Sequence, residues 1–185
     1  MDATDTKAAA ERDVLLVKEA RGGDRSAFGQ LYAQYARMVH GILLAKVPHT
    51  DVDDLVQEVF FRAWRQLGKL RDPATFCAWL ATIARNRAND YYRSRRETEE
   101  ISETMAIADG TASAAEARAA LAAIQALPDT YRETLTLRLV EGLTGPEIAA
   151  ATGLTHESVR VNLHRGMKLL RERLSGSASA AKEGI

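Results

Sequence analysis

The chain has 185 residues, of which 46% are hydrophobic, and its 25 Lys and Arg balance its 25 Asp and Glu. Such a composition fits a folded chain of one domain or two small ones, and no window approaches the roughly 18 consecutive apolar residues of a membrane helix. The polar N-terminus has no secretion-signal pattern, and the single cysteine, Cys77, fits a reducing compartment, so we expect a cytoplasmic protein without direct membrane insertion.

The first half of the chain predicts helices throughout. An apolar helix around Val14 and Val17 ends at Gly22–Asp24, and a longer one carries an apolar stripe over residues 28–43. The clearest stripe covers residues 52–67, with acidic residues in its first turn, where carboxylates favour the helix dipole. Residues 68–76 contain Gly and Pro and predict a loop before the next helix.

That next helix ends in RNRANDYYRSRR, residues 85–96, which holds five arginines and two tyrosines with one acid. The apolar stripe that begins at Phe76 faces inward, and the opposite side then forms a polar ridge. Guanidinium groups pair with phosphate, while amide and aromatic groups bind unpaired bases. The ridge consists of Arg85, Asn89, Arg93 and Arg96, flanked by Asn86 and Tyr92. A merely solvated basic face is the alternative interpretation.

The chain then changes character. Residues 97–115 are acidic and rich in small side chains, which predicts a flexible linker. Periodicity returns at 116–175, with two helices split at Pro128, and the tail at 176–185 lacks core-forming residues and is expected to be disordered. The predicted fold is therefore all-α, with two small helical domains, residues 1–96 and 116–175, on a tether.

A helix-turn-helix pattern lies in the second domain. Thr144 and Glu147 have capping-box spacing, Gly153 suits a tight turn, and Thr155 caps a longer helix. The outer face of that helix offers donors to phosphates and base edges. These residues are His156, Ser158, Arg160, Asn162, His164, Arg165 and Lys168. An ordinary helical hairpin with a solvated basic face is the competing interpretation.

The two halves together resemble one family. DVDDLVQEVFFRAWRQLGKLRDPATFCAWLATIARNRANDYYRSRR is similar to the second region of bacterial sigma factors, and LPDTYRETLTLRLVEGLTGPEIAAATGLTHESVRVNLHRGMKLLRERL is similar to the fourth. Both matches occur in the family's order and leave no room for a first or third region. The chain therefore resembles the compact, two-domain extracytoplasmic-function class, whose members bind core RNA polymerase and direct it to promoters.

The resemblance implies partners and contacts. Core RNA polymerase would be bound through its β′ coiled coil and its β flap, and the helix at residues 51–67 would dock on the coiled coil. The outward residues of that helix are Asp54, Gln57, Glu58, Phe61 and Arg65. Phe61 is the informative one, because an aromatic side chain facing solvent suggests a partner. Packing of Phe61 on a neighbouring helix is the plainer alternative.

The resemblance also implies DNA contacts. The N-terminal domain would read and open the minus-ten element, with the loop at residues 68–76 capturing a flipped base. The implied residues are Arg71, Asp72, Phe76, Arg85, Asn86, Asn89, Tyr92, Arg93 and Arg96. The helix from Thr155 would read the minus-thirty-five element. An anti-sigma factor is expected as a further partner, as is common in the family, and neither a cofactor nor a small-molecule substrate is expected.

Three other functions compete with this one. An enzyme is disfavoured because the sequence has no glycine-rich phosphate loop or nucleophile elbow, and its four histidines show no metal-ligand spacing. A stand-alone helix-turn-helix regulator would leave the arginine ridge without a function, and a protein that sequesters a sigma factor would not need DNA contacts.

Cys77 is interpreted as a packing residue rather than a redox sensor, since no second thiol accompanies it.

Overall fold

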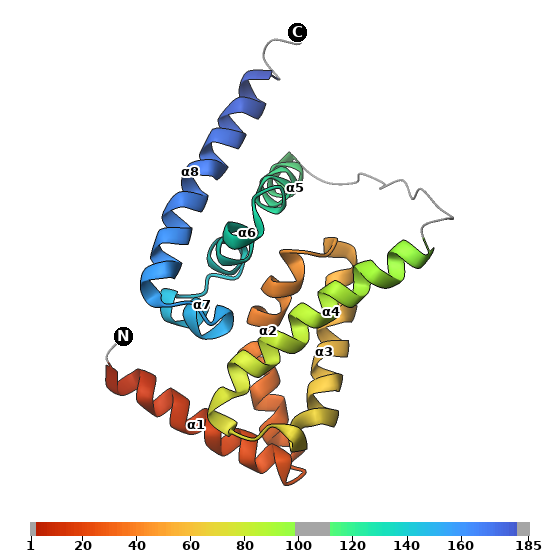
Figure 1. The fold of residues 1–185 in the computed structure, drawn as a ribbon, viewed down its shortest axis with the longest axis vertical. Helices are drawn as coiled ribbons and strands as arrows, with labels where there is room; N and C mark the ends of the chain where they lie inside the picture. Colours follow the sequence, from red (N-terminus) through yellow and green to blue (C-terminus); the bar gives the residue numbers. More distant parts are fainter. Residues whose placement is uncertain (1–2, 99–111, 181–185) are drawn as a thin grey trace.

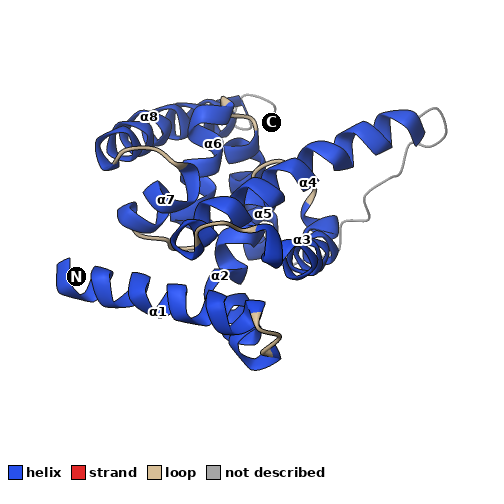
Figure 2. Ribbon diagram, turned by 60° about the horizontal axis from the view of Figure 1, so that its bottom comes forward, coloured by secondary structure: helices blue, strands red, loops and turns tan. Residues whose placement is uncertain are grey.

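The computed structural model describes the backbone of residues 3–98 and 112–180, and the side chains of residues 11–94 and 117–175. Every regular element in these ranges is helical, as the sequence predicts. Figures 1 and 2 show the N-terminal helices α1–α4 as one group and α5–α8 as a second group beside α2 and α4. Among the described helices, none combines the length and the hydrophobicity that a membrane-spanning segment needs.

The N-terminal domain is a four-helix arrangement. It consists of α1 (Ala3–Arg21), α2 (Arg25–Leu44), α3 (Val52–Gln66) and α4 (Phe76–Thr98). Asp24 caps α2 by accepting hydrogen bonds from the backbone of Ser26 and Ala27, which satisfies two of the helix's free N–H groups. Short 3₁₀ turns, His49–Asp51, Leu67–Lys69 and Pro73–Thr75, connect the helices.

The core of this domain draws one apolar face from each helix. Val17, Leu31, Val59 and Leu80, from α1 to α4 in that order, have no measurable exposure. Burial of such side chains contributes roughly 1.5–3 kcal/mol each relative to leaving them in water. Aromatic rings extend the core, with Phe28 and Trp64 in an edge-on contact at 4.8 Å between centroids. The helical stripes that the sequence predicted therefore form this core.

The C-terminal domain contains the predicted helix-turn-helix. Its elements are α5 (Ala112–Gln125), α6 (Asp129–Leu135), the π-helical turn η4 (Thr136–Val140), α7 (Gly145–Thr152) and α8 (His156–Ala180). The break at Pro128 is confirmed, but the single helix expected after it becomes α6 followed by η4. A small core of Ile124, Leu127, Leu135 and Leu170 joins α5, α6 and α8.

Two expected boundaries differ from the observed ones. Helix α4 runs to Thr98 and α5 begins at Ala112, so the helices take up both ends of the predicted linker, and residues 99–111 lie outside the described part. Helix α8 continues to Ala180, which corrects the expectation of a disordered tail for residues 176–180. Once a helix is formed, adding a further residue costs little, so a helix can continue beyond the segment that its apolar periodicity marks.

The two domains pack against each other in this structure. Helix α2 contacts η4, and α4 contacts α7. Leu137 of η4 and Ile148 of α7 are fully buried in the same apolar cluster as Leu31 and Leu80 of the N-terminal domain. The sequence predicted a tether and gave no indication of this contact.

Candidate nucleic-acid and protein interfaces

The outer face of α3 is open to solvent. All five residues expected there are exposed: Asp54, Gln57, Glu58, Phe61 and Arg65. Phe61 is 61% exposed, so it does not pack into a neighbouring helix, and the Arg65 guanidinium lies 5.7 Å from the centre of its ring. Glu58 accepts a hydrogen bond from Arg87 of α4 at 2.6 Å, which lowers the pKa of Glu58. An exposed aromatic ring with a cation over it can contact a protein partner.

The loop before α4 divides into exposed and buried parts. Arg71 and Asp72 are exposed, and the Asp72 carboxylate accepts a hydrogen bond from the backbone of Ala74 at 3.0 Å. Phe76, which the sequence placed among the DNA contacts, is only 1% exposed and packs between Tyr35 and Trp79. The expectation that Phe76 contacts DNA is therefore corrected. Its ring is fixed in the core, where it anchors the loop and cannot reach a ligand.

The later part of α4 keeps most of its predicted polar ridge. Asn86, Asn89, Tyr92 and Arg93 are exposed, and the side chain of Arg96 lies outside the described residues. Arg93 pairs with Asp90 one turn earlier at 2.7 Å, and the Tyr92 hydroxyl donates to the backbone oxygen of Lys46. An exposed ion pair of this kind contributes little to stability, so the Arg93 guanidinium is available to an anionic ligand.

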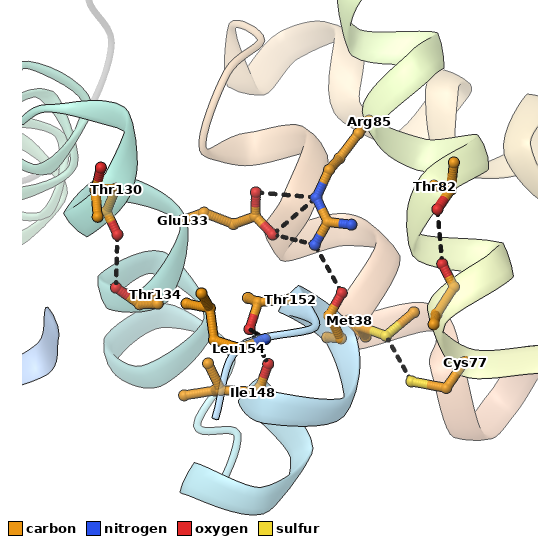
Figure 3. Close-up of polar contacts among 12 residues, drawn as sticks. Met38, Cys77, Thr82, Arg85, Thr130, Glu133, Thr134, Ile148, Thr152 and Leu154 are labelled. Atoms are coloured by element: carbon orange, nitrogen blue, oxygen red, sulfur yellow. Dashed lines mark hydrogen bonds and ion pairs between the residues drawn. The ribbon is translucent and has the colours of Figure 1, made fainter. Parts of the chain in front are cut away.

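Arg85 differs from the rest of the ridge. Its guanidinium donates from Nε and Nη2 to the Glu133 carboxylate of α6, with a shortest distance of 2.6 Å, and from Nη2 to the Ala151 oxygen of α7 at 2.7 Å. Figure 3 shows the Arg85 guanidinium directed at the Glu133 carboxylate. The expectation that Arg85 faces solvent is therefore wrong for this arrangement, since its neighbours come from the other domain.

The helix-turn-helix is formed as the sequence predicts. Thr144 and Glu147 make the reciprocal capping box, and Gly153 has a φ of 73°, a left-handed conformation that glycine adopts without strain. The Thr155 hydroxyl accepts a hydrogen bond from the backbone of Ser158 at 3.1 Å. The exposed face of α8 carries His156, Arg160, His164, Arg165 and Lys168, while Ser158 is half-buried.

Asn162 is the exception on this helix. It is 8% exposed, and its Nδ2 donates to the backbone oxygen of Thr130 in α6 at 3.3 Å. The expectation that Asn162 lies on the DNA-facing side is corrected. The spacing Val159, Asn162, Gly166 and Leu170 follows the buried face, and this periodicity could have assigned the residue correctly.

Sequence reasoning also missed a polar cluster at the domain contact. Glu141, directly after η4, is 7% exposed and shares a 2.6 Å hydrogen bond with His40 Nδ1 of α2, while its backbone oxygen accepts from Arg37. The hydrogen bond to Glu141 raises the pKa of His40, against the opposing effect of burial. Nothing in either segment alone indicates the pairing, because the partners are about a hundred positions apart.

Cys77 lies at the start of α4, beside the interior. Its Sγ is 3.6 Å from the Met38 sulfur (Figure 3), and burial raises the pKa of the thiol to about 11. A thiol that stays protonated at neutral pH is a poor nucleophile, which supports its interpretation as a packing residue. Among the described residues, no group of three or more His, Cys, Asp or Glu could hold a metal ion.

Comparisons with known proteins agree with the two-domain reading. The Sigma-70 region 2 family matches residues 31–98, and the Sigma-70 region 4 family matches residues 117–170. The chain is 32% identical to the RNA polymerase sigma factor CnrH of Cupriavidus metallidurans, over 94% of this chain and 97% of that protein. It is 29% identical to the ECF RNA polymerase sigma-E factor of Escherichia coli K12, over 85% of this chain and 92% of that one.

A longer relative and a solved structure extend these matches. A probable RNA polymerase sigma factor, RfaY of Xanthomonas campestris, is 36% identical over 84% of this chain, which spans only 42% of RfaY. The structure of CnrH in complex with the cytosolic domain of CnrY has a TM-score of 0.65 and 30% identity, and the alignment covers 89% of this chain and 98% of CnrH.

Proposed function

The chain belongs to the extracytoplasmic-function class of RNA polymerase sigma factors, and from this membership we propose how its two domains share promoter recognition. A sigma factor binds core RNA polymerase and directs transcription initiation at promoter DNA. The polymerase supplies the chemistry, so the proposal assigns no catalytic residue to this chain. It also places the chain in the cytoplasm, where bacterial polymerase acts.

The N-terminal domain docks on the polymerase through α3. Its outer face offers one exposed aromatic ring, Phe61, with charged residues around it, and this combination suits a polar protein surface with one apolar anchor. We assign this face, with Asp54, Gln57, Glu58 and Arg65, to the β′ coiled coil. The C-terminal domain then lies near the β flap.

The same domain engages the minus-ten element through α4 and the loop before it. Arg93 and Tyr92 offer a charge for phosphate and a ring for an unstacked base, and Asn86 and Asn89 add amide groups on the same helix. Arg71 and Asp72 stand at the exposed edge of the loop. Strand opening requires only that splayed bases bind better than paired ones, by enough to offset a few kcal/mol of unstacking.

The C-terminal domain reads the minus-thirty-five element with α8. Its first turns expose Arg160, His164 and Arg165, on a helix that a capped α7 and the Gly153 turn hold at a fixed angle. A bidentate contact from arginine to a base edge contributes about 1–3 kcal/mol of discrimination. We assign phosphate contacts to the exposed His156 and Lys168 at the two ends of this face.

A protein partner that inhibits the chain is part of the proposal. CnrH, which the chain resembles over nearly its whole length, was solved in complex with the cytosolic domain of CnrY. We expect an anti-sigma factor for this chain as well, covering the polymerase-binding or DNA-binding face. Pull-down with a tagged chain from the native cell, followed by inhibition of transcription by the captured protein, tests this expectation.

The observation that carries the proposal is that both sigma regions match in order along one chain, with the basic face of α8 exposed. The test is run-off transcription with purified core polymerase on a pool of genomic fragments. We expect start sites that depend on the chain, with Arg160→Ala changing the upstream sequence preference and Arg173→Ala, an exposed control late in α8, leaving it unchanged. Absence of start-site selection with the wild-type chain would contradict the proposal and favour a stand-alone DNA-binding regulator.

A further inference from the structure

The contact between the two domains covers a surface that the proposed function needs. Helices α2 and α4 of the N-terminal domain face η4 and α7 of the C-terminal domain, and Leu137, Ile148 and Ala151 are buried there, each 1% exposed or less. Apolar side chains buried between domains favour association in water. We call this arrangement, in which η4 and α7 pack on α2 and α4, the closed form. A continuous apolar contact therefore supports the closed form.

Gly41 makes this close approach possible. A Cβ added at Gly41 would lie 2.7 Å from Glu141 Cγ and 2.9 Å from Leu137 Cδ2, both closer than ordinary van der Waals contact. Gly41 lies inside α2, where glycine costs about 0.5–1 kcal/mol relative to alanine. The fold of the N-terminal domain alone gives no reason for a glycine here, whereas the approach of η4 does.

Two acidic residues of the C-terminal domain then pair with the N-terminal domain. Glu133 binds Arg85 of α4 at 2.6 Å, and its side chain is 15% exposed. Glu141, which is buried, shares a 2.6 Å hydrogen bond with His40 of α2. Arg37 adds a hydrogen bond to the Glu141 backbone oxygen. A partly buried carboxylate is stable when it is paired in this way, so both contacts favour the closed form.

The pairing of Arg85 has a direct consequence for DNA binding. Two of its nitrogens are already directed at Glu133 and at the Ala151 oxygen, and α7 lies against the helix turn that carries it. A phosphate cannot take the same bidentate position while the Glu133 carboxylate occupies it. Binding of nucleic acid at this part of α4 therefore requires the C-terminal domain to move.

We propose that the chain inhibits itself through this contact: Glu133, Glu141 and η4 hold the C-terminal domain over Arg85, and the chain must open before it binds polymerase and promoter productively. The inhibitory effect rests on the proposed function, whereas the closed arrangement does not. A chain that is mostly closed binds its target with an apparent dissociation constant raised by the reciprocal of the open fraction. Opening a chain that is about 90% closed would then strengthen binding about tenfold.

The experiment uses the full-length chain and two kinds of opening variant. Gly41→Leu inserts a side chain where Glu141 and Leu137 approach, and its matched control, Gly29→Leu, lies in the same helix with no atom within 4 Å of the added Cβ. The double variant Glu133→Gln and Glu141→Gln removes both carboxylates. Its controls are the single variant Asp129→Asn, whose carboxylate pairs with Arg132 within the C-terminal domain, and wild type.

Small-angle scattering measures closure, and binding to core polymerase measures its effect. We expect a larger radius of gyration for Gly41→Leu and for the Glu133 and Glu141 double variant, and a dissociation constant for core polymerase lowered about three- to tenfold. The controls should match wild type in both measurements. Helicity and thermal unfolding of each variant identify any that fail to fold, and the charge variant then decides if Gly41→Leu does not fold.

Distinct outcomes separate the two claims. A wild-type chain as extended as both opening variants would overturn the closed arrangement. Variants that open but bind polymerase no more tightly than their controls would overturn its inhibitory role. A wild-type chain that supports no transcription at all would instead contradict the proposed function, and the scattering comparison would still decide whether the chain closes.

Discussion

The outer face of α3 and the polar ridge of α4 belong to the same domain, and both were expected to face solvent. The face of α3 does so, with Phe61 61% exposed, whereas Arg85 on α4 is held by Glu133 and by a carbonyl oxygen of the other domain. An amphipathic pattern shows which side of a helix leaves its local core. It does not show whether a second domain then covers that side.

This difference suggests that the two faces become available at different stages. The α3 face is accessible in the closed chain, while the region around Arg85 becomes accessible only after opening. Contact through α3 alone is therefore open to the closed chain, whereas the contacts around Arg85 that productive binding needs form only after the domains separate.

Loss of the Phe61 ring should have the largest effect on binding. Phe61→Ala is expected to weaken polymerase binding by about 2 kcal/mol, or roughly 30-fold, because a central aromatic anchor dominates such interfaces. Thermal stability should change little, since the ring is mostly exposed. Leu15→Ala, which removes another exposed apolar side chain from α1, is the matched control. Equal binding by both variants would remove α3 from the polymerase interface.

Exchanging the charges of Arg85 and Glu133 should separate closure from DNA binding. Arg85→Glu and Glu133→Arg should each open the chain, because each places like charges together, and the double variant should close again with a coupling free energy of about 1–2 kcal/mol. Promoter opening should stay weak in the double variant, which lacks the Arg85 charge on α4. Strictly additive effects of the two substitutions on the radius of gyration would show that the pair does not hold the domains.

The same distinction between exposed and covered residues can be tested on α8. Asn162→Ala should lower the free energy of unfolding by about 1 kcal/mol, since it removes the hydrogen bond to Thr130, and should leave upstream sequence preference unchanged. Arg160→Ala should change the upstream sequence preference and leave the free energy of unfolding nearly unchanged, because its guanidinium is exposed. A changed sequence preference in Asn162→Ala would return this residue to the DNA-facing side.

The smallest expected effect is a dependence of closure on pH. His40 faces Glu141 of the C-terminal domain and Asp53 of α3, with Arg37 one turn earlier, and the closed form raises its pKa above the ordinary value of 6.5. Because the shift is upward, His40 stabilises the closed form fully below that value, and this contribution is lost as the pH rises through the raised pKa. The open fraction should therefore increase toward alkaline pH.

Scattering across this pH window checks the expectation. His40→Gln should remove the dependence, and His49→Gln, which changes an exposed histidine in the turn before α3, should retain it. A pH dependence that persists in His40→Gln would assign the effect to another group.

The sequence was sufficient to predict those features that depend on interactions between neighbouring residues. The cap at Thr144, the glycine at Gly153, the break at Pro128 and the amphipathic stripes were all predictable, because each depends on neighbours within a few positions. The exposed residues of α3 and most of those on α8 followed from the same periodicity. Phe76 and Asn162 were assigned to the DNA-facing set, although each lies on the apolar periodicity of its helix.

What the tertiary structure alone decided is the relation between the domains. The amino-acid order predicted the helices of the described residues and the helix-turn-helix, because helix periodicity and capping depend on short stretches of sequence, while the sigma-factor assignment followed from the family resemblance. The pairing of Arg85 with Glu133 joins positions 48 residues apart, and that of His40 with Glu141 joins positions 101 apart. Such contacts arise only when separate apolar faces meet, and no short-range pattern specifies which faces those are.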